Sequence, residues 1–122
     1  MENLSGWKQA IGKWGENIAA SYLGELGYQV IARNYRTPHG EIDLVALREG
    51  MLVFVEVKTR TSRTYGLPED SITPRKKKSM QSAAEYYLEK SGEYDTWQYD
   101  VIAIERQSSG KVEIHLFENV FG

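Results

Sequence analysis

Two runs of β-forming residues joined by a short turn constrain most strongly what this chain can fold into. The runs are residues 41–47 and 51–58, and Arg48-Glu49-Gly50 between them places a glycine where a tight turn needs one. If Glu49 and Gly50 form a two-residue turn, Arg48 lies opposite Met51 and the register of the whole hairpin follows. We therefore predict an antiparallel hairpin with a defined register.

Four charged residues interrupt this apolar hairpin at its open end: Glu41, Asp43, Glu56 and Lys58. The predicted register places Asp43 opposite Glu56 and Glu41 opposite Lys58. Because side chains alternate between faces, all four are expected on one face, with the Cβ atoms of Asp43 and Glu56 about 4.5–5.5 Å apart. A slip of one residue would move one strand's charges to the other face, so this expectation depends on the two-residue turn.

Two carboxylates directly opposite each other repel, and burying a carboxylate without a partner is costly. A divalent cation with a preference for oxygen ligands, Mg²⁺ or Mn²⁺, would compensate, and Lys58 would then stand beside the metal. An alternative is a purely structural hairpin end in which Lys58 neutralises Glu41 or Glu56. Three carboxylates against one lysine leave that cluster negatively charged, which favours the cation.

Composition limits the classes of protein and site that need to be considered. With 122 residues and 41% hydrophobic content, the chain is expected to form one domain, residues 1–122, with a sizeable core. The absence of a long apolar stretch or a basic leader predicts a cytoplasmic protein without membrane spans. The chain has no cysteine and only two histidines, His39 and His115, both expected at the surface. A metal site should therefore be built from carboxylates.

The distribution of charge indicates a nucleic-acid partner more than the total charge does. The net charge is −2 and the pI near 5.7, but residues 58–78 carry seven cations against two acids, which leaves −7 for the rest. The cations are Lys58, Arg60, Arg63, Arg75, Lys76, Lys77 and Lys78. The last four begin an expected helix, where positive charge opposes the helix dipole unless a phosphate binds there. A basic rim that binds nucleic acid and a solvated charged face both fit the lysine run.

Periodicity and turn residues predict an α/β fold with the order α-β-β-β-α-β-β. Apolar residues at helical spacing predict a first helix over residues 6–26, and Thr73-Pro74 and Gly92 delimit a second one. Besides the hairpin, strands are expected at 28–36, 98–104 and 112–117. This order suits a mixed central sheet flanked by helices, in which the second helix crosses over between the third and fourth strands.

The charged positions also resemble a known signature. Asp43, followed on the next strand by Glu56-x-Lys58, resembles the PD-(D/E)xK nuclease signature, with Ile42 where its name has proline. The longer strings extend the resemblance over nearly the whole chain: residues 40–46, 54–60, Gly66-x-Pro68-Glu69 and residues 99–103. Together they resemble the YraN-type bacterial family, which is similar to archaeal Holliday junction resolvases. The resemblance implies a restriction-endonuclease-like core, a homodimer, and a first-helix glutamate, here Glu16, at the metal site.

Our first hypothesis is a Mg²⁺-dependent endonuclease that hydrolyses the DNA backbone. Asp43, Glu56 and the Val57 carbonyl would bind the metal, Lys58 would orient the attacking water, and Glu16 or Glu41 would assist. Glu16 could instead pair on the helix surface with Lys13 or Lys8. Two other functions stay open: a noncatalytic nucleic-acid-binding module with the nuclease fold, and a protein-interaction domain. Nothing in the sequence distinguishes duplex, junction, single strand or RNA as the substrate.

Overall fold

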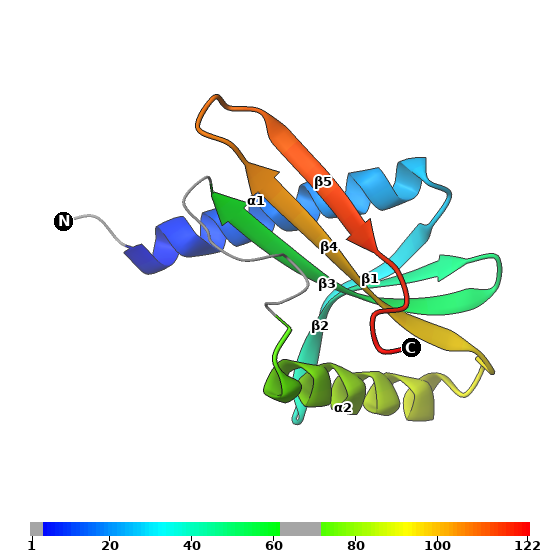
Figure 1. The fold of residues 1–122 in the computed structure, drawn as a ribbon. Helices are drawn as coiled ribbons and strands as arrows, with labels where there is room; N and C mark the ends of the chain where they lie inside the picture. The colour runs from blue at the N-terminus through cyan, green and yellow to red at the C-terminus, as the bar shows by residue number, and fades with distance from the viewer. Residues whose placement is uncertain (1–3, 62–71) are drawn as a thin grey trace.

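Seven elements of secondary structure follow one another in the predicted order (Figure 1). The computed structural model describes residues 4–61 and 72–122. The elements are α1 (Leu4–Glu25), β1 (Gln29–Thr37), β2 (Gly40–Arg48), β3 (Met51–Thr61), α2 (Pro74–Ser91), β4 (Trp97–Arg106) and β5 (Val112–Phe117). The predicted α/β fold class and the order α-β-β-β-α-β-β are therefore confirmed. This is the arrangement expected of a restriction-endonuclease-like core.

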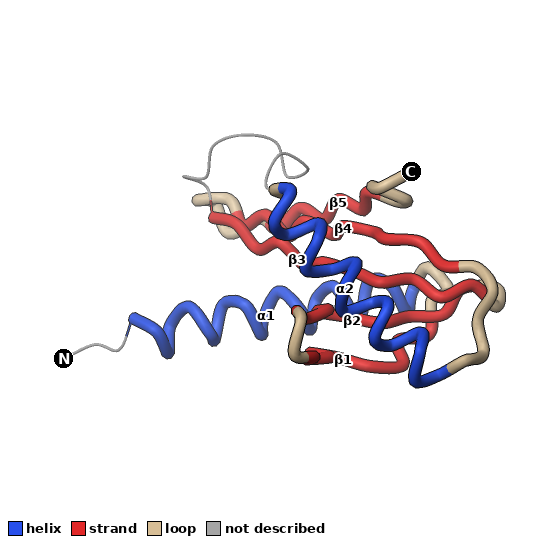
Figure 2. The backbone as a smooth tube through the Cα atoms, turned by 90° about the horizontal axis from the view of Figure 1, so that it is seen from below, coloured by secondary structure: helices blue, strands red, loops and turns tan. Residues whose placement is uncertain are grey.

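The five strands form one mixed sheet in the order β1-β2-β3-β4-β5. The pairs β1–β2, β2–β3 and β4–β5 are antiparallel, whereas β3 and β4 are parallel. Parallel neighbours need a crossover, and α2 supplies it on one face of the sheet, while α1 covers the other face (Figures 1 and 2). The predicted role of the second helix is confirmed.

The core has two apolar layers, one under each helix. Under α1, Ala19 and Leu23 pack against side chains of β2, β3 and β4 such as Val53 and Val55. Under α2, Met80 and its neighbours pack against Phe54 and other residues of the opposite sheet face. The central strand β3 is therefore buried on both faces, which explains its continuous apolar run.

The hairpin between β2 and β3 has the predicted register. Its pairs run from Leu44 opposite Val55 to Arg48 opposite Met51. The turn between the strands is formed by Glu49 and Gly50, whose φ angles are both positive, 50° and 79°. Positive φ at both central residues is typical of the two-residue turns that suit a twisted hairpin.

The second helix is delimited by the residues that the sequence indicated. The Thr73 side chain accepts a 3.1 Å hydrogen bond from the Lys76 backbone N–H, and Pro74 occupies the first turn. At the other end, Gly92 has a φ of 62° and donates its N–H to the Leu88 carbonyl at 2.9 Å. In the described part of the chain, no helix is both long and apolar enough to cross a membrane.

Candidate active site

The strands β2 and β3 separate at Asp43, and this fork is where the charged residues gather. The last ladder pair is Leu44 with Val55. Beyond it, the Val57 backbone N–H donates a 2.8 Å hydrogen bond to the Asp43 carboxylate oxygen Oδ2. A side chain thus replaces the backbone carbonyl that a continued β2 strand would have offered. The Asp43 carboxylate is held against the backbone of the strand that carries Glu56.

The alternation of side chains along β2 is broken at the fork. Ile42 and Val45 are both buried under α2, although strict alternation would place them on opposite faces. Glu41 precedes Ile42 and lies opposite Arg36 of the neighbouring strand β1. The Glu41 carboxylate oxygen Oε2 is 3.5 Å from Arg36 Nε. The expectation that all four charged side chains share one face, with Glu41 opposite Lys58, was therefore wrong. The side chain of Glu41 is 51% exposed, so it lies at the margin of the site.

Glu56 is a buried carboxylate with one oxygen left without a partner. Only 4% of the residue is exposed, and its Oε1 lies 3.1 Å from Lys76 Nζ and 3.6 Å from Lys58 Nζ. Its Oε2 is buried and has no hydrogen-bond partner among the described residues. Burial and the negative charge of Asp43 raise the pKa of Glu56 to about 7, although both lysines act in the opposite direction. Two ammonium groups therefore do not fully compensate the buried charge.

Asp43 is in a similar electrostatic position. Burial raises its pKa above the ordinary value, while the hydrogen bond from Val57 and the positive charge of Lys76 act against that rise. Because Asp43 in turn raises the pKa of Glu56, the two carboxylates are close enough to repel each other. A proton or a cation between them would relieve the repulsion.

Glu16 brings a third carboxylate to the fork from α1. Burial and the negative charge of Asp43 raise its pKa, and a hydrogen bond with the Asn34 side chain acts in the opposite direction. Among the described ion pairs, none joins Glu16 to Lys13, the pairing considered above as a surface alternative; the side chain of Lys8 lies outside the described residues. We call Glu16, Asp43 and Glu56 the carboxylate cluster; in the described part of the chain their carboxylate oxygens do not all lie within 4.8 Å of one another.

Two glycines allow the helices to approach this cluster closely. A Cβ atom at Gly15 would overlap the side chain of Thr59, so α1 contacts β3 directly beside Glu16. A Cβ atom at Gly40 would overlap Ser79, whose backbone oxygen would be 2.5 Å away, so the start of β2 lies against α2. Because glycine has no Cβ atom, Gly15 and Gly40 allow both helices to lie this close to the fork.

The four basic residues that begin α2 point in three directions. Lys76 reaches Glu56, whereas the ammonium group of Lys77 lies over the ring of Phe121, 5.1 Å from its centroid. Arg75 and Lys78 line a groove beside His39. The four residues therefore do not form one continuous basic rim, and Lys76 lies beside the carboxylate cluster; nucleic-acid binding by these residues stays a prediction.

The inward direction of Lys76 could have been predicted from its spacing to an apolar residue of the same helix. Lys76 precedes the buried Met80 by four residues, which places both on the same face of α2. Of the other predicted cations, Arg60 lies half-buried on β3, and Arg63 lies outside the described residues together with the Gly66–Glu69 part of the resemblance. His39 and His115 are exposed, as predicted.

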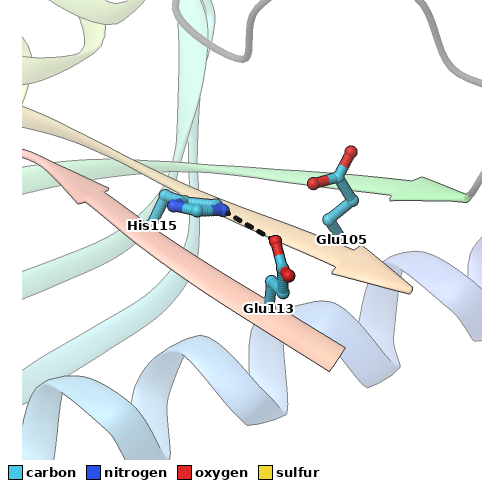
Figure 3. Close-up of side chains that lie close together, drawn as sticks. All are labelled: Glu105, Glu113 and His115. Atoms are coloured by element: carbon cyan, nitrogen blue, oxygen red, sulfur yellow. Dashed lines mark ion pairs between the residues drawn. The ribbon is translucent and has the colours of Figure 1, made fainter. Parts of the chain in front are cut away.

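A second group of potential metal ligands, which the sequence did not indicate, lies on β4 and β5 (Figure 3). One ligand atom each from Glu105, Glu113 and His115 lies within 4.8 Å of the others. Glu113 already contacts His115 at 3.5 Å and accepts a 2.8 Å hydrogen bond from Gln107. None of the three is buried, so their charges lack the desolvation that makes Glu56 depend on a partner. The pairing of Glu105 with Glu113 across this hairpin could have been predicted from its turn.

Comparison with known proteins places the chain in a family. Residues 15–104 match the family described as "Uncharacterised protein family UPF0102". The chain belongs to this family. The UPF0102 protein of Syntrophomonas wolfei subsp. wolfei is 41% identical over 112 residues, which are 91% of this chain and 96% of that protein. The UPF0102 protein STH1475 of Symbiobacterium thermophilum is 42% identical over 112 residues, covering 91% and 95%. The UPF0102 protein of Chlorobaculum parvum is 46% identical over 113 residues, covering 90% and 86%.

The UPF0102 match covers the whole fork. It contains the whole carboxylate cluster together with Lys58 and Lys76, and it ends at residue 104, before the group that begins with Glu105. Membership in UPF0102 confirms the YraN-type resemblance. The burial of Glu56 therefore favours the fork as the functional site.

Proposed function

We propose that this protein is a Mg²⁺- or Mn²⁺-dependent endonuclease that hydrolyses the DNA backbone at the fork between β2 and β3. The observation that carries the proposal is the buried Oε2 of Glu56, which has no partner among the described residues. It faces repulsion from Asp43 although two lysines are near. A buried acceptor of this kind is costly unless a cation or proton completes the site.

The residues at the fork fit a hard divalent cation. Carboxylate and carbonyl oxygens are its preferred ligands, and Asp43, Glu56 and the Val57 carbonyl would hold it. In a β-strand the carbonyl of a residue points to the same side as its N–H, and the Val57 N–H points to Asp43 beyond the end of the ladder. When bound, the cation would stabilise negative charge on the phosphate and lower the pKa of a water.

The chain's own cations have separate tasks in this proposal. Lys58, 28% exposed at its side chain, would orient or deprotonate the attacking water. Lys76 would hold Glu56 in place and offer positive charge to a phosphate oxygen. Glu16 approaches Asp43 from the α1 side and would hold a water, whereas the exposed Glu41 would act only through its charge.

A noncatalytic nucleic-acid-binding module is the second candidate function. The observation that favours it is the second lysine: Lys58 and Lys76 bring two positive charges to the fork, and a proton on Glu56 would relieve the remaining repulsion from Asp43 without any divalent ion. A protein-interaction domain is the third candidate, in which the fork is only a salt-bridged structural element. Retention of the nuclease fold does not by itself require activity.

Cleavage assays separate the first candidate from the others. The purified protein would be incubated with a labelled four-way junction, a linear duplex and a single strand in Mg²⁺ or Mn²⁺, alongside Asp43→Asn and Lys58→Ala. We expect divalent-dependent cutting that is lost in both variants, with the folded state of each variant checked by circular dichroism. The junction is included because the sequence resembles junction resolvases, and native mass measurement would test the proposed homodimer. Binding without cutting would support the second candidate.

Calorimetric titration tests the metal site without relying on activity. Heat on addition of Mg²⁺ or Mn²⁺ should disappear in Glu56→Gln and persist in Glu113→Gln, a matched change in the β4–β5 group. The reverse pattern would place the metal at Glu105, Glu113 and His115. An absence of heat in the parent protein would argue for the protein-interaction domain or a metal-free binding module.

A further inference from the structure

The groove between α2 and the turn before β2 gathers cations that have no partner among residues 4–61 and 72–122. Its volume is about 470 Å³, and it is lined by His39, Arg75, Lys78, Ser79 and Ser82. Among the described residues, neither Arg75 nor Lys78 has an ion pair or hydrogen bond through its side chain. Both are exposed. The groove therefore combines two fixed positive charges with an imidazole and two hydroxyl groups.

Positive charge at this place is unfavourable for the protein alone. Arg75 and Lys78 stand in the first turns of α2, where the helix dipole already gives a partial positive charge. An anion in the groove would turn this repulsion into attraction, and guanidinium, ammonium and hydroxyl groups are common ligands of phosphate oxygens. The side chains that line the groove are therefore suited to bind a phosphate group.

The groove and the carboxylate cluster lie on two sides of the same helix turn. Lys76, between Arg75 and Lys78 in sequence, points to Glu56, and the close contact of Gly40 with Ser79 joins the turn before β2 to the groove. One polymer of phosphates could therefore occupy both places, whereas a single free anion could not. We propose that the groove binds a backbone phosphate of the nucleic-acid strand that is cut at the fork. This inference rests on the proposed function and adds the path of its substrate.

The opposite end of the groove limits how far the strand extends. A second depression shares His39 and Ser82 with the groove but is lined further along α2 by Glu85 and Glu89. These acids repel phosphates, so the strand leaves α2 near Ser82. Arg75 and Lys78 can each neutralise one phosphate, so the groove would account for up to two neighbouring phosphates of the strand.

The salt dependence of DNA binding tests this assignment. The double variant Arg75→Gln/Lys78→Gln is compared with Arg106→Gln/Lys111→Gln, which removes the same charges from exposed positions at the β4–β5 hairpin. Both are made in the Asp43→Asn background, so that binding is measured without cutting. Fluorescence anisotropy of a short labelled DNA duplex is recorded across a range of NaCl concentrations. We expect the groove variant to bind more weakly and its slope of log K against log [NaCl] to shrink by about two, with little change in the control.

Two results would overturn the groove assignment: an unchanged slope in the groove variant, or equal losses in both variants. Absence of duplex binding by the Asp43→Asn parent would overturn it as well. The proposed function has its own readout, the cutting of DNA by the unmodified chain. A parent that binds through the groove but never cuts would leave the groove assigned and remove the endonuclease, so the two failures are distinguishable.

Discussion

The ammonium group of Lys76 lies 3.1 Å from Glu56 Oε1, closer than the 3.6 Å of Lys58, which is the lysine of the resembled signature. Lys76 belongs to α2 and Glu56 to β3, so this ion pair ties the first turn of the crossover helix to the carboxylate cluster. The side chain of Lys76 is 26% exposed, so solvent screens its attraction to Glu56 only in part. The position of α2 and the charge state of Glu56 are therefore linked.

Replacing Lys76 by methionine tests this link. We expect Lys76→Met to lower the free energy of unfolding by about 1–2 kcal/mol in EDTA at pH 8, because the buried Glu56 charge is then left with Lys58 alone. Lys78→Met is the matched control, since Lys78 is exposed and should change stability by less than about 0.5 kcal/mol. Urea unfolding measures both. Equal stability of the two variants would mean that the ion pair contributes nothing in solution.

The raised pKa of Glu56 predicts a characteristic pH dependence of stability. The pKa is about 7 in the folded protein against 4.5 for the ordinary group, so the folded state binds the proton more tightly. The free energy of unfolding of the metal-free protein should therefore fall as the pH rises from about 4.5 to about 7, and level off above. This contribution should be about 3 kcal/mol.

Glu56→Gln should remove that contribution and leave those of the other titrating groups. Urea unfolding of the parent and the variant in EDTA, at several pH values from 5 to 8, gives the comparison. The difference in unfolding free energy between the two proteins should change steadily from pH 5 to about 7 and level off toward pH 8. A constant difference would show that Glu56 titrates in the folded state as it does in the unfolded chain.

The contact of Gly15 with Thr59 predicts that even a methyl group at this position is costly. Gly15→Ala should destabilise the protein by about 1–3 kcal/mol, because the new Cβ atom would force α1 away from β3. It should also reduce cutting, since Glu16 moves with α1. Gly12→Ala on the same helix has no atom within 4 Å of its new Cβ and should be neutral or stabilising by up to about 1 kcal/mol.

Thermal unfolding and the cleavage assay measure the two glycine variants. Thr59→Ala added to Gly15→Ala should restore part of the loss, because it removes the oxygen and methyl group that the new Cβ meets. If Gly15→Ala were as stable as Gly12→Ala, the close approach of α1 to β3 would be refuted.

Asp100 should be important for stability and unimportant for metal binding. It is fully buried, and its carboxylate accepts 2.9 Å hydrogen bonds from the Gln98 side chain and the Asn119 backbone N–H, and a 3.4 Å bond from the Tyr28 hydroxyl. These contacts give Asp100 a structural role. Asp100→Ala should cost about 2–4 kcal/mol, because several donors lose their partner. Calorimetry should find its Mg²⁺ affinity unchanged, and a selective loss of that affinity with stability retained would contradict this role.

The hairpin shows what could be predicted from local residues. Its register followed from the two-residue turn at Glu49 and Gly50, because turn conformation and strand pairing depend on neighbours in the sequence. The ends of α2 followed in the same way from Thr73 and Gly92. The register brings Asp43 and Glu56 to the same end of the hairpin, but the ladder ends at Leu44 and Val55, so the hydrogen bond from Val57 to the Asp43 carboxylate was not contained in it.

The faces of the side chains around the fork were harder to predict. Glu41 left the expected face because Ile42 and Tyr35 pack under α2 and break the alternation in β2. That break is decided by contacts between elements far apart in the chain, which a local pattern does not contain. The prediction of four charges on one face failed for this reason.

The sequence by itself determined the order of elements, the hairpin register and the placement of Asp43 and Glu56 at one end of the hairpin, because each depends on local propensity and turn chemistry. The spacing of Lys76 and Met80 indicates that Lys76 faces inward, but its contact with Glu56 and the groove that Arg75 and Lys78 line beside His39 depend on how α2 packs against the sheet. Successive residues of a helix point about 100° apart. The burial of Met80, Ala83 and Ala84 against the sheet therefore fixes the directions of all the remaining side chains on α2. The packing of α2 therefore directs Lys76 to Glu56 and Lys77 to the ring of Phe121, and leaves Arg75 and Lys78 along the groove.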